Sequence, residues 1–169
     1  HMVDSMPKPI TAAKVLEYWT SVAGMCRADR DGVMFDELHW KGDDETYTAY
    51  IEAVKQLAAD PAFRGRIFEP YTTPMHPGKV SSEFVKATIA AGYKIAEETY
   101  IAEQPSEDDA PKVFHNQMVE NTRSYQKLVP DCQPHMIICM GYMTAPPECQ
   151  NVNSGLNWKG LQHIQDHLL

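Results

Sequence analysis

The residues best suited to catalysis are a cysteine, two histidines and a glutamate that lie far apart in the sequence. Cys149 lies in a polar stretch, and His76 and His115 are histidines that could approach it in the folded chain. A catalytic cysteine needs a neighbouring base that favours its thiolate form, and Glu120 could orient that base or exchange protons itself. These four residues define one hypothesis, a small hydrolase or transferase with a Cys/His site.

A pair of histidines near the end of the chain suggests a metal site. His163 and His167 are four residues apart, so they share one face of the helix expected over about 156–168, as zinc ligands do. A solvated helix end predicts the same pattern, because histidines interact favourably with the negative end of the helix dipole. A third ligand would have to come from elsewhere, and no cofactor is expected.

Cys132, His135 and Cys139 form another cluster of metal-binding residue types. In an extended strand, His135 and Cys139 would lie about 13 Å apart, because a strand rises about 3.3 Å per residue. That separation is too large for both side chains to bind one ion, so this cluster is not expected to hold zinc.

Acidic and polar side chains define a candidate binding surface. An acidic stretch between two prolines could meet a basic partner, and the following helix carries polar residues at three-and-four spacing, which places them on one face. A solvent-exposed face predicts the same spacing. The residues assigned to binding are Glu107, Asp108, Asp109, Asn116 and Arg123.

Composition excludes several classes of function. The formal net charge of −8 argues against nucleic acid as a partner, because phosphate binding needs clustered lysine and arginine. No apolar stretch reaches the roughly 18 residues of a membrane helix, and no export signal is seen, which favours a soluble, cytoplasmic protein with reduced cysteines. The glycine-rich signatures of dinucleotide, nucleotide and serine-hydrolase sites are also missing.

The function expected from these observations is a non-catalytic binding or regulatory module. It would engage a protein partner, or a second copy of itself, through its acidic surface and the proline-bearing loops over 70–79 and 144–155. The alternative, the small Cys/His enzyme, stays open because catalytic residues can meet in space without a sequence motif.

Apolar periodicity predicts the elements that would position these residues. Helices are expected over 11–26, 44–59, 81–104, 112–128 and 156–168, and strands over 33–40, 66–69 and 135–142. The prolines at positions 70, 74 and 77 predict a loop, and Gly92 inside the long helix suggests close approach of another backbone.

The predicted fold class is α+β, with about five helices packed on a small sheet of two or three short strands. The continuous apolar run over 135–142 predicts a strand at the centre of that sheet. Residues 1–2 are typical of a cloning remnant, so the expected single globular domain covers 3–169.

Overall fold

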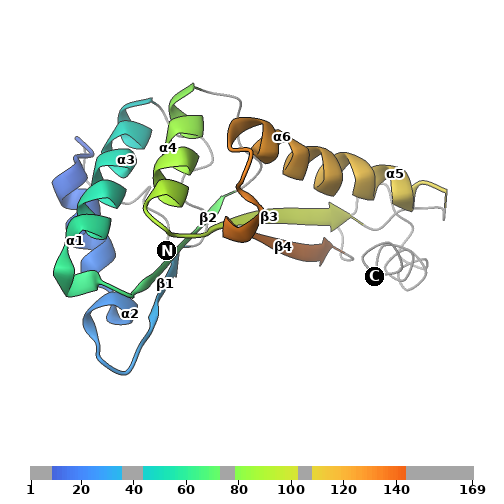
Figure 1. The fold of residues 1–169 in the computed structure, drawn as a ribbon. Coiled ribbons are helices and arrows are strands. Elements are labelled where there is room, and N and C mark those ends of the chain that lie inside the picture. The colour runs from blue at the N-terminus through green and yellow to red at the C-terminus, as the bar shows by residue number, and fades with distance from the viewer. Residues whose placement is uncertain (1–8, 36–43, 73–78, 103–107, 144–169) are drawn as a thin grey trace. The chain divides into compact units, whose positions relative to one another are not determined.

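The computed structural model describes residues 9–35, 44–72, 79–102 and 108–143. Within these ranges the strands form one sheet in the order β1-β2-β3-β4 (Figure 1). The strands are β1 (Gly32–Phe35), β2 (Ile67–Thr72), β3 (Ile95–Ala102) and β4 (Met136–Met143). All are parallel and alternate with helices, so the fold is α/β. The expectation of helices packed on a small sheet is confirmed, but the predicted α+β class is wrong.

Helical connections explain the parallel sheet, because parallel neighbours need a long crossover between them. Helix α3 (Asp44–Ala59) joins β1 to β2, and α4 (Lys79–Ala90) joins β2 to β3. The third connection contains α5 (Ala110–Phe114) and α6 (Glu120–Leu128). The predicted helix over 44–59 is confirmed with the same bounds.

The predicted helix over 11–26 is divided in two. Helix α1 (Ala12–Ser21) begins after Thr11, whose hydroxyl accepts a hydrogen bond from the Lys14 N–H at 3.4 Å. Helix α2 (Ala23–Cys26) follows Val22, whose extended backbone interrupts the helix. The amphipathic pattern over 11–26 is continuous in the sequence, although the backbone is not helical at Val22.

Strand β2 continues through a proline that was expected to end it. Pro70 pairs with Phe35, the last residue of β1, and the next residue, Tyr71, pairs with Ala96 of β3. Pro70 therefore lies between the described pairs with β1 and those with β3. The missing N–H costs least at such a position, which is why the predicted loop over 70–79 starts too early.

The long helix predicted over 81–104 is also wrong, because α4 ends at Ala90 and β3 follows. Gly92 has φ of +82°, and its N–H binds the Ile89 carbonyl while the Tyr93 N–H binds that of Thr88. This pair of bonds is a Schellman motif, which ends a helix with a left-handed residue. A Cβ at Gly92 would meet no atom within 4 Å, so close backbone approach does not explain this glycine.

The apolar run that forms β4 is a strand, as predicted, but it does not lie at the centre of the sheet. It occupies one edge, next to β3, and the side chain of Ile138 is large and 49% exposed. Continuous hydrophobicity was interpreted as burial on both faces. The exposure of a strand depends on which elements pack against it. The apolar composition of β4 alone does not determine it.

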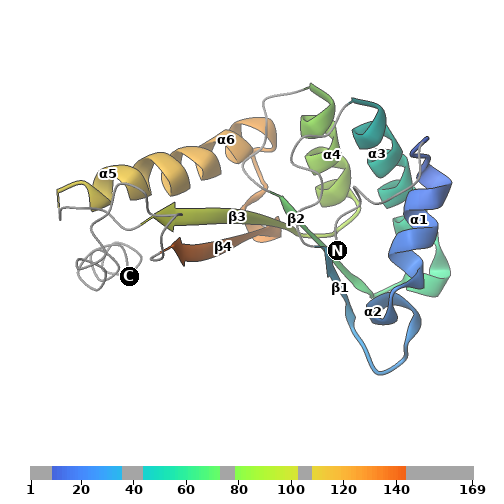
Figure 2. The same ribbon diagram turned by 180° about the vertical axis from the view of Figure 1, so that it is seen from behind.

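The chain divides into two compact units, which are His1–Glu97 with Asp131–Ile137, and Glu98–Pro130 with Ile138–Leu169. Figure 2 shows α1, α3 and α4 of the first unit side by side. Their core is aromatic: the Trp19 ring lies 4.6 Å from Phe68, 5.6 Å from Tyr50 and 5.9 Å from Phe35, centroid to centroid. The Tyr50 and Phe84 rings, 5.8 Å apart, extend the cluster to α4.

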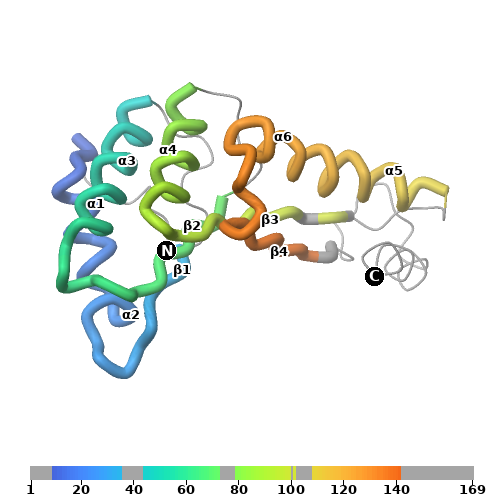
Figure 3. Tube along the Cα trace, in the orientation of Figure 1, coloured from blue at the N-terminus to red at the C-terminus, as the bar shows by residue number. Residues whose placement is uncertain are grey.

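The second unit has a smaller core in which Ile101 of β3 packs with Ala110 and Met118. The helix that carries Ala110 and Met118 is continuous in the tube of Figure 3. It contains a π-helical segment, His115–Val119, between α5 and α6. The predicted helix over 112–128 is therefore confirmed, with a widened turn inside it. In the part of the chain that the structure describes, no helix is long and apolar enough to span a membrane.

The role of Gly92 gives a test of this fold. Replacing Gly92 with alanine should destabilise the protein by roughly 1–2 kcal/mol, because a Cβ disfavours positive φ. Gly92→Asn should lose less stability than Gly92→Ala, since asparagine tolerates this conformation and the surrounding space is open. Chemical denaturation measures both values. A larger loss for asparagine would instead support steric crowding at this site.

Candidate functional site

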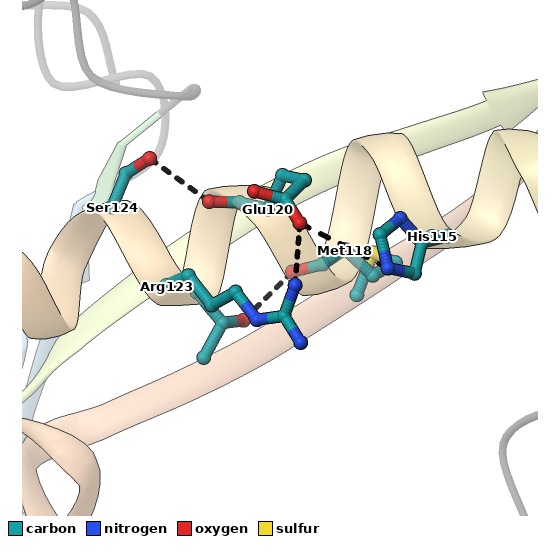
Figure 4. Close-up of polar contacts among 6 residues, drawn as sticks. His115, Met118, Glu120, Arg123 and Ser124 are labelled. Atoms are coloured by element: carbon teal, nitrogen blue, oxygen red, sulfur yellow. Dashed lines mark hydrogen bonds and ion pairs between the residues drawn. The ribbon is translucent and has the colours of Figure 1, made fainter.

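A π-helical turn brings together two of the predicted catalytic residues. The Glu120 N–H binds the His115 carbonyl five residues earlier, which defines the widened turn. In a regular α-helix, residues five apart point about 140° away from each other. Here the His115 Nε2 and Glu120 Oε1 atoms lie 3.8 Å apart (Figure 4). The π turn therefore creates a pair that helical periodicity alone would not predict.

Arg123 completes a polar cluster with these two residues. Its Nη1 atom lies 2.6 Å from Glu120 Oε1, so one carboxylate oxygen faces both the guanidinium and the imidazole. The Ser124 hydroxyl donates to the Glu120 carbonyl at 2.9 Å, and the Thr122 hydroxyl donates to that of Met118 at 2.8 Å. These hydroxyls satisfy carbonyls around the turn, where the helical hydrogen-bond pattern changes.

The exposure of this cluster determines what it can do chemically. The side chains of His115, Glu120 and Arg123 are 53%, 44% and 55% exposed. Water therefore competes for every polar atom, and the arginine already neutralises the carboxylate that would act as a base. The geometry supports surface recognition of charged or polar groups better than an enclosed reaction site.

The other predicted site residues are not brought to this cluster in the described chain. Asp109 forms an ion pair with Lys112 at 3.0 Å, while Asp108 and Asn116 are exposed. The remaining ones lie outside the residues that the structure describes, so their assignments stay predictions: His76, Glu107, Cys149, His163 and His167.

A groove between the first turns of α1 and α3 was not predicted. It is open, has a volume of about 430 Å³, and has a mainly apolar lining. Its lining residues are Ile10, Thr11, Ala12, Asp44, Glu45, Thr48, Ala49 and Glu52. The signal in the sequence was the spacing of Glu45, Thr48 and Glu52, which places them along one helix face.

Acidic side chains dominate the charge of this groove. Asp44 and Glu45 are exposed in the first turn of α3, where the helix dipole favours negative charge. Glu52 accepts a hydrogen bond from Lys55 at 2.7 Å, and both side chains are at least half exposed. The groove thus combines an apolar lining with carboxylates contributed by a single helix.

Cys26, Cys132 and Cys139 are free cysteines among the residues that the structure describes, and the expected reduced state of the protein stays a prediction. Cys26 is exposed and Cys132 is fully buried, with its Sγ atom 3.4 Å from the Met136 Sδ. Burial raises the pKa of the Cys132 thiol, because a thiolate would lose its hydration. Among the residues that the structure describes, no three His, Cys, Asp or Glu side chains lie together as candidate ligands for one metal ion.

Comparisons with known proteins found no match to this chain. No protein-family model matches the chain, and no curated protein or solved structure matches it significantly. The candidate sites therefore stand on their own geometry.

The exposed ion pair between Glu120 and Arg123 should contribute little to stability. A double-mutant cycle with Glu120→Gln and Arg123→Gln should give a coupling free energy of roughly 0.2–1 kcal/mol, because solvent screens exposed pairs. Chemical denaturation at low and high salt measures this coupling. A coupling well above 1 kcal/mol, unchanged by salt, would contradict the open geometry.

The rate of thiol alkylation should differ between Cys26 and Cys132. Cys26 should react first with iodoacetamide under native conditions, since Cys132 is buried and its raised pKa leaves little thiolate. The Cys132 reaction should keep accelerating with pH beyond the range in which an ordinary thiol ionises. Peptide mass spectrometry of timed samples follows each site, with urea-unfolded protein as the control. Equal native rates would show that Cys132 is accessible.

Proposed function

We propose that this protein is a non-catalytic binding module that engages a basic segment of a protein partner through the groove between α1 and α3. The observation that carries the proposal is the combination of an apolar groove with exposed carboxylates on Asp44, Glu45 and Glu52. Neither feature alone specifies an occupant. Together they suit a segment in which lysine or arginine flanks an apolar side chain.

Charge complementarity argues for a basic occupant. Carboxylates on the groove would attract lysine and arginine, and the net charge of −8 would favour encounter with a basic partner from a distance. The apolar floor, formed by Ile10, Ala12 and Ala49, would supply the hydrophobic contact that exposed charges alone do not provide. The expected affinity is modest, because the groove is open on one side.

The support of the groove is rigid, which favours binding without a large entropy cost. Helix α3 carries the three carboxylates on one face and buries Tyr50, Ala53, Val54 and Leu57 on the other. A peptide would therefore meet carboxylates whose backbone positions are already determined by the core. The His115 cluster supports a second contact surface less strongly, because it lacks a groove.

A defined peptide tests this proposal. We expect a short peptide with leucines flanked by lysines to shift the amide signals of Thr48, Ala49 and Glu52 in an NMR titration. A peptide with glutamates in place of the lysines should produce no such shifts. Salt should weaken the binding, since exposed charges contribute to it. Absence of shifts in the groove, or equal shifts for both peptides, would contradict the proposal.

The chain offers a closely matched control for charge reversal. Glu52 and Glu83 each pair with a lysine three residues later, and their side chains are 50% and 51% exposed. Glu52→Lys should weaken binding of the basic peptide at least about tenfold, whereas Glu83→Lys on α4 should change it much less. Equal losses in both variants would indicate attraction to overall charge and not binding in the groove.

A further inference from the structure

The turn that precedes β4 contains three residues with soft or borderline metal-binding atoms, and it brings two of their side chains, Cys132 and Met136, into contact. The segment is a short 3-10 turn, Gln133–His135, flanked by Cys132 and Met136. The Sγ atom of Cys132 lies 3.4 Å from the Sδ atom of Met136. His135 belongs to the same turn, and its backbone N–H binds the Cys132 carbonyl at 2.8 Å.

We propose that Cys132, His135 and Met136 bind one Cu(I) ion. This site shares no residue with the groove of the proposed function or with the predicted His163/His167 pair. It also differs from a zinc cluster of Cys132, His135 and Cys139, because the third ligand is a thioether and Cys139 takes no part. Thiolate and thioether sulfur atoms are soft ligands, which favour soft metal ions such as Cu(I).

The positions of the sulfur atoms suit a shared ion. Metal–sulfur bonds are about 2.3 Å long, so an ion between two sulfur atoms 3.4 Å apart can reach both. The turn also favours the third ligand, because residues three apart in a 3-10 helix lie on the same side. Cys132 and His135 have this spacing, and Met136 already contacts the cysteine.

A hydrogen bond prepares the His135 ring for binding. Its Nδ1 atom lies 3.2 Å from the Tyr93 carbonyl oxygen. A carbonyl oxygen can only accept a hydrogen bond, so Nδ1 carries a hydrogen, and in the neutral ring this leaves the lone pair on Nε2 for a metal ion. Histidines that bind metals usually donate their other N–H to a carbonyl or carboxylate in this way. The ring orientation is therefore maintained by a residue outside the turn.

Charge selects a monovalent ion for this position. Cys132 is fully buried, and a divalent ion with one thiolate would leave a net positive charge near the core. Cu(I) and one thiolate are together neutral. Binding replaces the thiol S–H bond with a sulfur–copper bond and releases one proton to solvent, with no change in oxidation state. His135 and Met136 are partly exposed, so the ion would enter from their side.

Competition for Cu(I) tests the site. The full chain, kept reduced and without oxygen, is titrated into the coloured Cu(I) complex of bicinchoninate. We expect the protein to withdraw about one equivalent of copper. Met136→Leu and His135→Gln should each weaken binding at least about tenfold, and Cys132→Ala should remove it. Copper X-ray absorption should show two sulfur ligands and one nitrogen ligand.

Matched variants separate this site from general thiol binding. Met140→Leu and Cys139→Ala change the same residue types on β4 and should leave the affinity within about twofold. Leucine closely replaces methionine in volume, so Met136→Leu decides the matter even if Cys132→Ala fails to fold. Circular dichroism checks each fold. Equal Cu(I) affinity in the wild type, Met136→Leu and His135→Gln would overturn the proposal and would leave the groove hypothesis unaffected.

Discussion

The first unit depends on the packing of Trp19 against aromatic rings from both helices and strands. Trp19 is fully buried, and its contacts with Phe35, Tyr50 and Phe68 join α1, α3, β1 and β2. Large aromatic side chains bury roughly 150–250 Å² each, so a cluster of this kind is a main source of stability in a small core. Their shapes also restrict how the helices lie on the strands. Two residues that line the groove also belong to this core, since Ala49 is part of the cluster and Ile10 packs against it.

Tyr93 links the aromatic core to the proposed copper site. Its ring packs 5.4 Å from Phe68, and its carbonyl accepts the hydrogen bond from His135. The Schellman motif at Gly92 directs the chain from α4 into this position. One short segment therefore ends α4, packs a ring against Phe68 and orients the His135 ring. Helix α3 has both a structural and a candidate binding face. Its apolar face packs in the core, and its opposite face carries the carboxylates of the groove.

The π turn illustrates how a small change in helix geometry creates a surface. One widened turn brings His115 to Glu120, and Arg123 then pairs with the same carboxylate. Widened turns of this kind often occur at functional sites. Here the three side chains are exposed, so the turn supplies an arrangement of charges and not a protected environment. Recognition of a partner requires only an arrangement of charges, whereas acid–base catalysis gains most when water is excluded.

The sequence alone determined the amphipathic helix over 44–59 and the strand nature of β4. Those features depend on local periodicity and on residue type. Tertiary structure decided the rest, because it depends on neighbours. Pro70 lies inside β2, between the residue pairs with β1 and those with β3, and Ile138 of the edge strand β4 is exposed although its strand is apolar. The segment over 95–102 has apolar residues compatible with a helix, but α4 ends at the left-handed turn of Gly92 and the segment forms β3, which pairs with β2. Likewise, the contact between Cys132 and Met136 required coordinates, since spacing identifies possible ligands and only the folded backbone brings their atoms together.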